Sequence, residues 1–305
     1  MNAEQAGQAG GFLAASVRVA TPLMLAATGE TITERAGIIN LSIEGCMLSG
    51  ALAAAMGAAW GNPWWGILAA AGAGLALAVV FASIVVGGGV DQIIAGMALT
   101  LGAVGVTGAA YRAAFGPEGV GLSLPTFPPS PVPGFADVPV IGTALFDQSV
   151  LSYLAYFTVL CGWFLLYRTR WGLALRATGE SIAAARAAGV PVQTTRFAAV
   201  LVGGGLGGLA GGSLVLAQVG TFAERMTAGR GFIAIAIVAL GGWHPLRVAL
   251  ASLFFGGTMA LQFVFQAAGL SAPYQLFLML PYLVTLFALA GFVGRLQPPS
   301  GLGKG

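Results

Sequence analysis

Long apolar runs, each interrupted only by isolated charges or by Gly and Pro, constrain the fold of this sequence more than any other feature. A helix that crosses the hydrocarbon core of a membrane needs roughly 20 predominantly apolar residues. Of the 305 residues, 57% are hydrophobic and 8% are charged, whereas roughly a quarter are charged in a soluble domain. A soluble globule is therefore excluded. The sequence predicts an all-α polytopic membrane protein, with residues 1–305 forming a single transmembrane domain.

We expect about eight transmembrane helices, of which one or two are half-helices. The weak segment 12–28 contains Arg18 and Pro22, so an interfacial position or a break at Thr21-Pro22 is an alternative to the crossing that the count of sides below assumes. The weak segment 231–242 is only about 18 Å long as a helix, which is typical of a half-helix. The strong segments are residues 37–59, 63–85, 91–111, 148–167, 196–219, 246–267 and 273–293.

Basic residues indicate the orientation, because short cytoplasmic loops are rich in Lys and Arg. The connection 168–196 carries five arginines against one acid, so we place it in the cytoplasm. Alternating the sides puts the N-terminus outside, and residues 29–36 and the C-terminus inside. Basic residues are then Arg35, Arg168, Arg170, Arg176, Arg186, Arg196, Arg247, Arg295 and Lys304 inside, against Arg112, Arg225 and Arg230 outside.

The connection 112–147 is expected outside the membrane and contains seven prolines. So many prolines exclude a long helix and favour extended or turn structure. The connection would form a lid, a docking surface or a passive linker.

The 48 glycines lie among Leu, Ala and Val with no three-residue period, which favours close helix packing in lipid. The glycine-rich stretch 203–212 would serve either as a sliding surface between helices or as static packing.

Catalytic motifs are absent from the sequence. The only histidine, His244, lies in the expected turn 241–245, where a structural role is more common than catalysis. No phosphate-binding Gly-x-x-x-x-Gly-Lys-Ser/Thr pattern occurs, so ATP hydrolysis is not expected in this chain. Cys46 and Cys161 lie in apolar stretches and are interpreted as small buried hydrophobic residues, not metal ligands. The net charge of +3 is scattered, which argues against a nucleic-acid partner.

Four polar residues in or beside the spans are candidates for a translocation path, because ionisable groups cost roughly 2.5–3.5 kcal/mol at mid-helix. Glu44 follows Asn40 by four residues, so both would share one helix face. That face would line a cavity or, alternatively, form a hydrogen bond that ties two helices together. Asp91 and Gln92 open the next helix after three glycines, where an acid is also a normal N-terminal cap.

The stretch 171–196 predicts a short alanine-rich helix over residues 180–188. Capping residues lie at both ends, and Pro191 prevents continuation. Its small side chains, flanked by arginines, fit a groove on another protein better than a membrane surface, where large apolar anchors would be needed. The capping residues are Thr178 or Gly179 and Gly189, and the flanking arginines are Arg176 and Arg186.

Four ordered blocks over residues 18–293 resemble permeases of ATP-binding-cassette importers, in the branched-chain amino acid, ribose and nucleoside class. The N-terminal block is similar to permeases for nucleosides and simple sugars, and the block around 180–189 is similar to their coupling loop. The next block departs from the usual pattern at Asp91, where an asparagine is more common. The blocks are Thr21-Pro22-Leu23 with Gly29-Glu30, Glu34 to Gly37 and Asn40 to Gly45; Asp91 to Gly96; Gly179 to Gly189; and Met226 to Ala236 with Gly241, Trp243 and Pro245.

The resemblance implies an assembly in a bacterial inner or plasma membrane. Its members would be this chain, a second homologous permease, two ATPase subunits and an extracytoplasmic substrate-binding lipoprotein. ATP and Mg would bind to the ATPase, with no cofactor in this chain. The residues that would dock on the ATPase are Gly179, Glu180, Ala183, Ala184, Arg186, Ala188 and Gly189.

A second hypothesis is a stand-alone secondary transporter or channel, with Glu44 or Asp91 as its ion site. Such a protein has no need of a thin alanine-rich helix in the cytoplasm. A membrane enzyme ranks third because catalytic groups are few.

Overall fold

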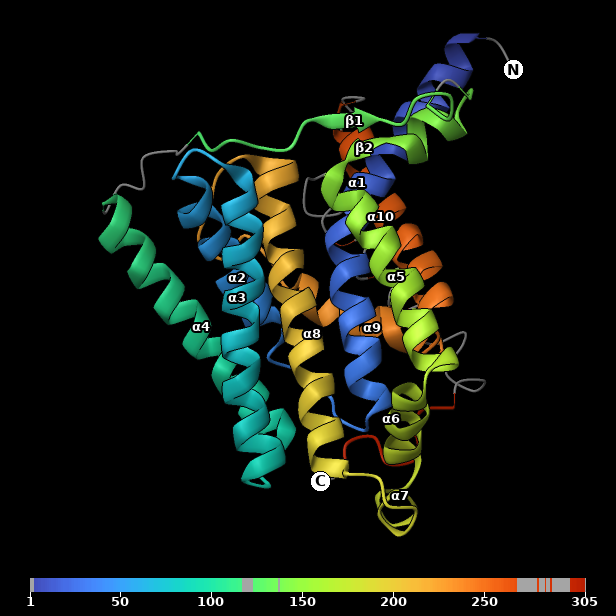
Figure 1. Cartoon of the computed structure of the whole chain (residues 1–305). Helices are drawn as coiled ribbons and strands as arrows, with labels where there is room; N and C mark the ends of the chain where they lie inside the picture. Colours follow the sequence, from blue (N-terminus) through green and yellow to red (C-terminus); the bar gives the residue numbers. More distant parts are fainter. Residues whose placement is uncertain are drawn as a thin grey trace.

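The computed structural model describes residues 3–116, 123–136, 138–267, 279, 283, 286 and 297–304, which form a helical bundle (Figure 1). Five described segments are long and apolar enough to cross a membrane: Ala9–Arg35, Pro63–Gly87, Gln92–Phe115, Val150–Arg168 and Val192–Val219. The helical class is thus confirmed, whereas the number of about eight transmembrane helices stays a prediction. The expected span 273–293 lies outside the described residues, apart from three isolated positions.

The helices are α1 (Ala3–Arg35), α2 (Ile43–Ala58), α3 (Pro63–Ala82), α4 (Gln92–Phe115), α5 (Val150–Arg168), α6 (Arg170–Glu180), α7 (Ile182–Ala187), α8 (Val192–Leu214), α9 (Arg230–Leu240) and α10 (Pro245–Ala267). Three π-helical stretches are η1 (Ser83–Gly87), η2 (Gly142–Phe146) and η3 (Val215–Val219). Strands β1 (Pro129–Pro131) and β2 (Asp147–Ser149) pair antiparallel, with Pro129 opposite Ser149. They lie at the end of the bundle opposite α7, and we name these the β end and the α7 end (Figure 1).

Helix α1 runs through the middle of the bundle and packs against α8 on one side and α5 and α10 on the other (Figure 1). The expected break at Thr21-Pro22 is wrong, since α1 continues through Pro22. An interfacial position of segment 12–28 stays a prediction. Proline has no N–H to donate to the carbonyl of Arg18, four residues back. Gln218 of η3 supplies the missing donor, with its Nε2 2.7 Å from that oxygen. A residue 200 positions away therefore keeps the helix intact.

Residues 29–36 are also not the loop that we expected. They form the buried last turns of α1 and its end, with Glu30 and Glu34 at 0% and 2% exposure. The following helix α2 begins only at Ile43, so Asn40 precedes it and does not share a helix face with Glu44. By contrast, α9 has 11 residues, which agrees with the length expected of a half-helix.

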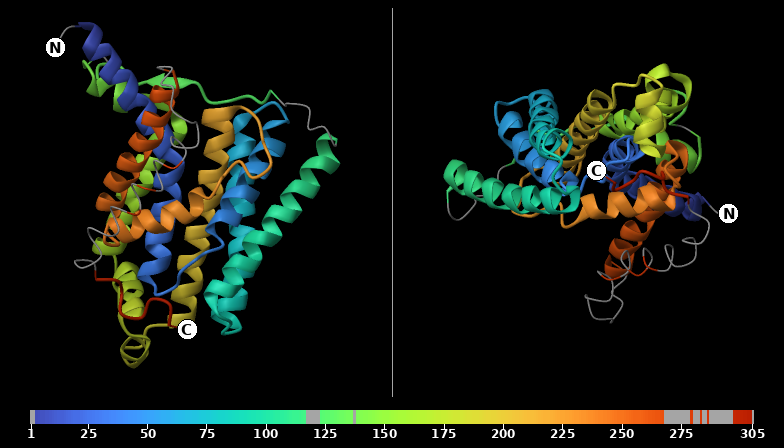
Figure 2. Two further views of the ribbon diagram at one scale, coloured as in Figure 1. Left: turned by 180° about the vertical axis from the view of Figure 1, so that it is seen from behind. Right: turned by 90° about the horizontal axis from the view of Figure 1, so that it is seen from below.

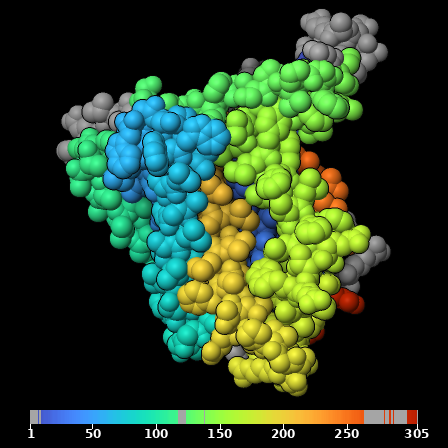
Figure 3. Space-filling view, in the orientation of Figure 1, coloured from blue at the N-terminus to red at the C-terminus, as the bar shows by residue number. Residues whose placement is uncertain are grey.

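Helix α8 holds the bundle together through its glycines. A methyl group at Gly208 would overlap the carbonyl oxygen of Ala70, and one at Gly211 would overlap that of Met47. Gly203 meets α1 in the same way, at Thr33 and Gly29. Helix α8 thus approaches α1, α2 and α3 at backbone contact, and Figure 3 shows it at the surface between α3 and α5. Close packing by glycine is confirmed, and sliding stays a prediction.

Helix α4 diverges from the rest of the bundle, as the view from the α7 end shows (Figure 2). The described part of the connection 112–147 crosses the β end and contains no long helix, as its prolines predict. Its lid or docking role is untested.

Two glycines in α3 provide a matched test of this packing. We expect Gly74→Ala to lower the free energy of unfolding by about 1–3 kcal/mol, because a β-carbon there overlaps the carbonyl of Gly204. Gly72→Ala, with nothing within 4 Å of the new atom, should be neutral or stabilise by up to about 1 kcal/mol. Thermal unfolding of the purified protein in detergent measures both, and equal stability of the two variants would contradict the packing.

Candidate functional site

The segment between α5 and α8 forms two helices at the α7 end of the bundle. Helix α7 begins after Ser181, whose Oγ accepts a hydrogen bond from the Ala184 N–H at 3.3 Å. It ends in a Schellman motif, since Val190 N–H donates to Ala185 O and Gly189 N–H to Arg186 O. Gly189 has a φ of +79°, which glycine adopts without strain. The expected helix over 180–188 is therefore wrong at its start: it begins at Ile182 after the Ser181 cap, because Thr178, Gly179 and Glu180 belong to the preceding helix α6.

The seven expected docking residues divide into two groups. Five are exposed on α7 and its end, around a single buried alanine, Ala185. These are Ala183, Ala184, Arg186, Ala188 and Gly189. Gly179 and Glu180 instead end α6, and a β-carbon at Gly179 would overlap the carbonyl of Arg35. These two residues therefore join α6 to the bundle.

Residues 299–304, which we name the tail segment, also contact α6. Gly301 N–H donates to Gly179 O at 2.8 Å, and Ser300 donates to Glu180 Oε2 through N and Oγ, at 3.2 and 3.0 Å. Gly303 N–H donates to Gly37 O at 3.3 Å, next to the end of α1. The sequence reasoning missed this role, because a Gly- and Pro-rich segment has no periodicity that reveals its partners.

The connection 36–42 between α1 and α2 is held by polar side chains. Glu30 Oε1 accepts from Asn40 N–H at 2.8 Å, and Asn40 Oδ1 accepts from Ser42 N–H at 3.1 Å. Gln92 Oε1 accepts from Ile39 N–H at 2.8 Å. Two of the candidate path residues, Asn40 and Gln92, thus meet at one turn, where both complete the backbone hydrogen bonding.

The turn between α9 and α10 is attached to the same end of α1. Glu34 Oε2 accepts from Trp243 Nε1, and Arg35 Nε donates to Trp243 O at 2.9 Å. Sequence reasoning missed Glu30, Glu34 and Trp243 as interior groups, although the four-residue spacing of the two acids indicates a common helix face. Partial burial, together with the charges of Arg247 and Arg35, lowers the pKa of His244 in this turn.

Glu44 accepts three hydrogen bonds at the start of the half-helix α9. Its Oε1 accepts from Thr227 Oγ1 at 2.6 Å and Gly229 N–H at 2.8 Å, and its Oε2 accepts from Gly231 N–H at 2.7 Å. The carboxylate therefore satisfies amides that have no partner within the helix and complements its dipole. Of the two readings, the hydrogen bond that ties two helices together is confirmed.

Asp91 caps α4, as its position predicts. Its Oδ1 accepts from Ile93 N–H at 2.9 Å and from Ile94 N–H at 3.0 Å. It borders the turn that Asn40 and Gln92 complete, whereas Glu44 acts separately at α9. A path role for these four residues stays a prediction.

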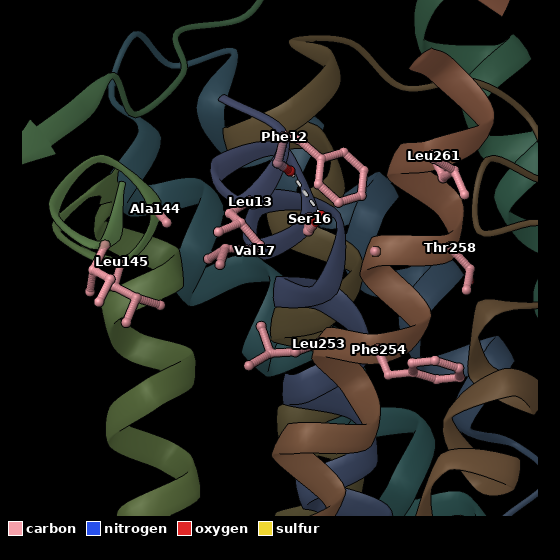
Figure 4. A pocket seen from close by; sticks show the side chains of 12 residues that line it. Phe12, Leu13, Ser16, Val17, Ala144, Leu145, Leu253, Phe254, Thr258 and Leu261 are labelled. Carbon is pink, nitrogen blue, oxygen red and sulfur yellow. Dashed lines mark hydrogen bonds between the residues drawn. The ribbon is translucent and has the colours of Figure 1, made fainter. Parts of the chain in front are cut away.

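An apolar pocket of about 420 Å³ lies between α1, η2 and α10 (Figure 4). Ser16, one of its few polar lining residues, already donates to Phe12 O at 2.8 Å. A polar solute would find few partners there. Within the described residues, no three or more His, Cys, Asp or Glu side chains are grouped to hold a metal ion.

Replacement of Glu44 separates its structural role from a path role. Glu44→Gln turns an amide toward the donor of Gly231 or Gly229, so we expect a loss of about 1–3 kcal/mol in the free energy of unfolding. Asp91→Asn is the control, because asparagine caps a helix as well as aspartate does. Unfolding of both purified variants is the measurement. Wild-type stability of Glu44→Gln with abolished transport would contradict the structural role.

Comparisons with known proteins agree with one another. The family model described as "Branched-chain amino acid transport system / permease component" matches residues 12–289. A guanosine ABC transporter permease of Bacillus subtilis is 33% identical over 95% of this chain and 94% of its own length. A putative glucose ABC transporter permease of Haloferax volcanii is 40% identical over 86% and 80%. A nucleoside ABC transporter permease of Lactococcus lactis is 33% identical over 93% and 92%. No solved structure matches significantly.

Proposed function

This chain belongs to the family of permease components of branched-chain amino acid transport systems, and from that premise we propose that it is the transmembrane permease subunit of an ATP-binding-cassette importer for nucleosides or simple sugars. The substrate class rests on relatives named for guanosine, nucleosides and glucose, which are similar over most of their length. ATP and Mg would bind to a separate ATPase subunit. A second permease and an extracytoplasmic binding lipoprotein would complete the importer.

The observation that carries the proposal is the form of α7. It is a short, capped helix with exposed alanines, which projects at one end of the bundle beside arginines (Figure 1). Small side chains let a partner approach the helix backbone closely, so α7 fits a groove on the ATPase. Glycines at 179 and 301 join the preceding helix to the end of α1 at backbone distance.

Movement of α7 would therefore move α1 and α8 as well. ATP-driven closure of the ATPases would shift α7, and packed helices change between discrete arrangements instead of deforming continuously. The ion-driven alternative has lost support, because the carboxylates of Glu44 and Asp91 are both engaged by backbone amides. No observation favours it.

A bulky residue on α7 tests docking. We expect Ala184→Trp to block the fit to the ATPase and to reduce ATP-dependent uptake at least about tenfold, which corresponds to about 1.4 kcal/mol of lost binding. Ala113→Trp is the matched control, because Ala113 is an exposed alanine in the last turn of α4, at the end of that helix away from α7. Uptake and co-purification of the ATPase are measured together. Normal uptake by a folded Ala184→Trp protein would refute docking by α7.

Cysteine labelling tests the orientation. Cys46 is buried, whereas Cys161 is exposed on α5, contrary to our expectation of two buried cysteines. In a Cys161→Ala background, we expect Ala183→Cys to react with a membrane-impermeant maleimide only in inside-out vesicles, because basic residues gather at this end. Ser130→Cys, in β1 at the β end, should react only in intact cells. The reverse labelling pattern would show that the orientation in the membrane is opposite to the expected one, and it would exclude a cytoplasmic ATPase contact at α7.

A further inference from the structure

A polar cavity of about 460 Å³ lies at the α7 end, between α7, the start of α4, the start of α8 and the tail segment. Its volume falls within the range of roughly 300–1,000 Å³ typical of ligand sites. Among the described residues, three cations and one carboxylate border it. The polar side chains that line it are Asp91, Gln92, Arg186, Gln193, Arg196 and Lys304.

Arg196 is the central group of this cavity. It is only 8% exposed, and its guanidinium donates to two backbone carbonyls, those of Ala36 and Lys304, at 3.2 Å each. No carboxylate pairs with it among the described residues, and the sequence contains no Asp or Glu after Glu224. A buried guanidinium without an anion is costly, because carbonyl dipoles compensate its charge only in part.

Further unused donors converge on the same cavity. Arg186 lies near enough to Arg196 for their charges to repel, and it forms no hydrogen bond or ion pair with the described residues. Gln92 is 6% exposed, and its acceptor oxygen is taken by Ile39 N–H, so its amide group is left to donate. The carboxylate of Asp91 is turned to the amides of Ile93 and Ile94. The uncommitted groups are therefore mainly donors and cations.

We propose that this cavity binds a phosphate group, held by Arg186 and Arg196 with Gln92 as a further donor. Planar guanidinium groups match phosphate oxygens in bidentate geometry, and such charge-assisted hydrogen bonds are about twice as strong as neutral ones. The source would be a soluble phosphate or an anionic lipid headgroup. Val90, which lines the cavity and is 46% exposed, would contact the acyl chains of a lipid. The proposal does not depend on the docking of α7.

The test follows thermal unfolding of the full-length permease in an uncharged detergent, by tryptophan fluorescence. One titration uses sodium phosphate against sodium chloride at equal ionic strength. The other uses short-chain phosphatidylglycerol against an uncharged glycolipid with the same chains. A ligand that binds only the folded protein raises its melting temperature in a saturable way. Stabilisation by inorganic phosphate indicates a soluble source, and stabilisation by the lipid alone indicates a headgroup.

Arg186→Gln is the decisive variant, because this exposed residue carries no described contact that folding needs. We expect its half-saturating concentration to rise at least about tenfold. Arg170→Gln removes the same charge from an exposed position of α6 outside the cavity and should leave the titration unchanged. An unaltered response in Arg186→Gln, or no saturable effect of either probe, would overturn the proposal. A further contradicting outcome would come from chemical modification of arginine. If ATPase binding protected Arg186 from the reagent and neither phosphate nor the lipid did, the cavity would hold a partner side chain and not a phosphate group.

Discussion

Every backbone amide and carbonyl inside this bundle needs a partner from the protein, because the hydrocarbon of a membrane supplies none. Where the main chain departs from regular helix, a side chain from another element provides that partner. Gln218 replaces the hydrogen bond that Pro22 removes from α1. Glu44 accepts from the free amides of the half-helix α9, and Glu30 and Gln92 accept from the connection between α1 and α2. These pairs allow a broken half-helix and a non-helical connection to lie inside the bundle.

The same principle explains why α1 is central. Its last turns bind two separate connections, through Glu30 to the start of α2 and through Glu34 and Arg35 to the turn at Trp243. Its end also contacts Gly179 of α6 and, through Gly37, the tail segment. Backbone contacts of α6 and the tail segment therefore link α7 to the end of α1. Glycines at these junctions matter because a larger residue would push the joined segments apart.

The sequence alone predicted the features that depend on local composition. The apolar runs predicted the long helices, the proline content predicted the irregular connection 112–147, and the run after Arg230 predicted a half-helix. The predictions failed where distant residues compensate each other. Hydropathy treats Glu30, Glu34 and Pro22 as reasons to end a helix, and it cannot reveal that Asn40 or Gln218 meets them in space. The error at Asn40 and Glu44 follows directly, since a helix that begins at Ile43 excludes the shared face.

The hydrogen bonds that these polar side chains form within the protein also limit which of them can bind a solute. A path that used Glu44 would require the solute to replace three hydrogen bonds, and each contributes about 1 kcal/mol to stability. Use of Asn40 or Gln92 would open the connection that holds α1 to α2. These side chains already form hydrogen bonds that stabilise the fold, so binding a solute through them would cost stability. A path that leaves these hydrogen bonds intact would have to contact the solute through other groups.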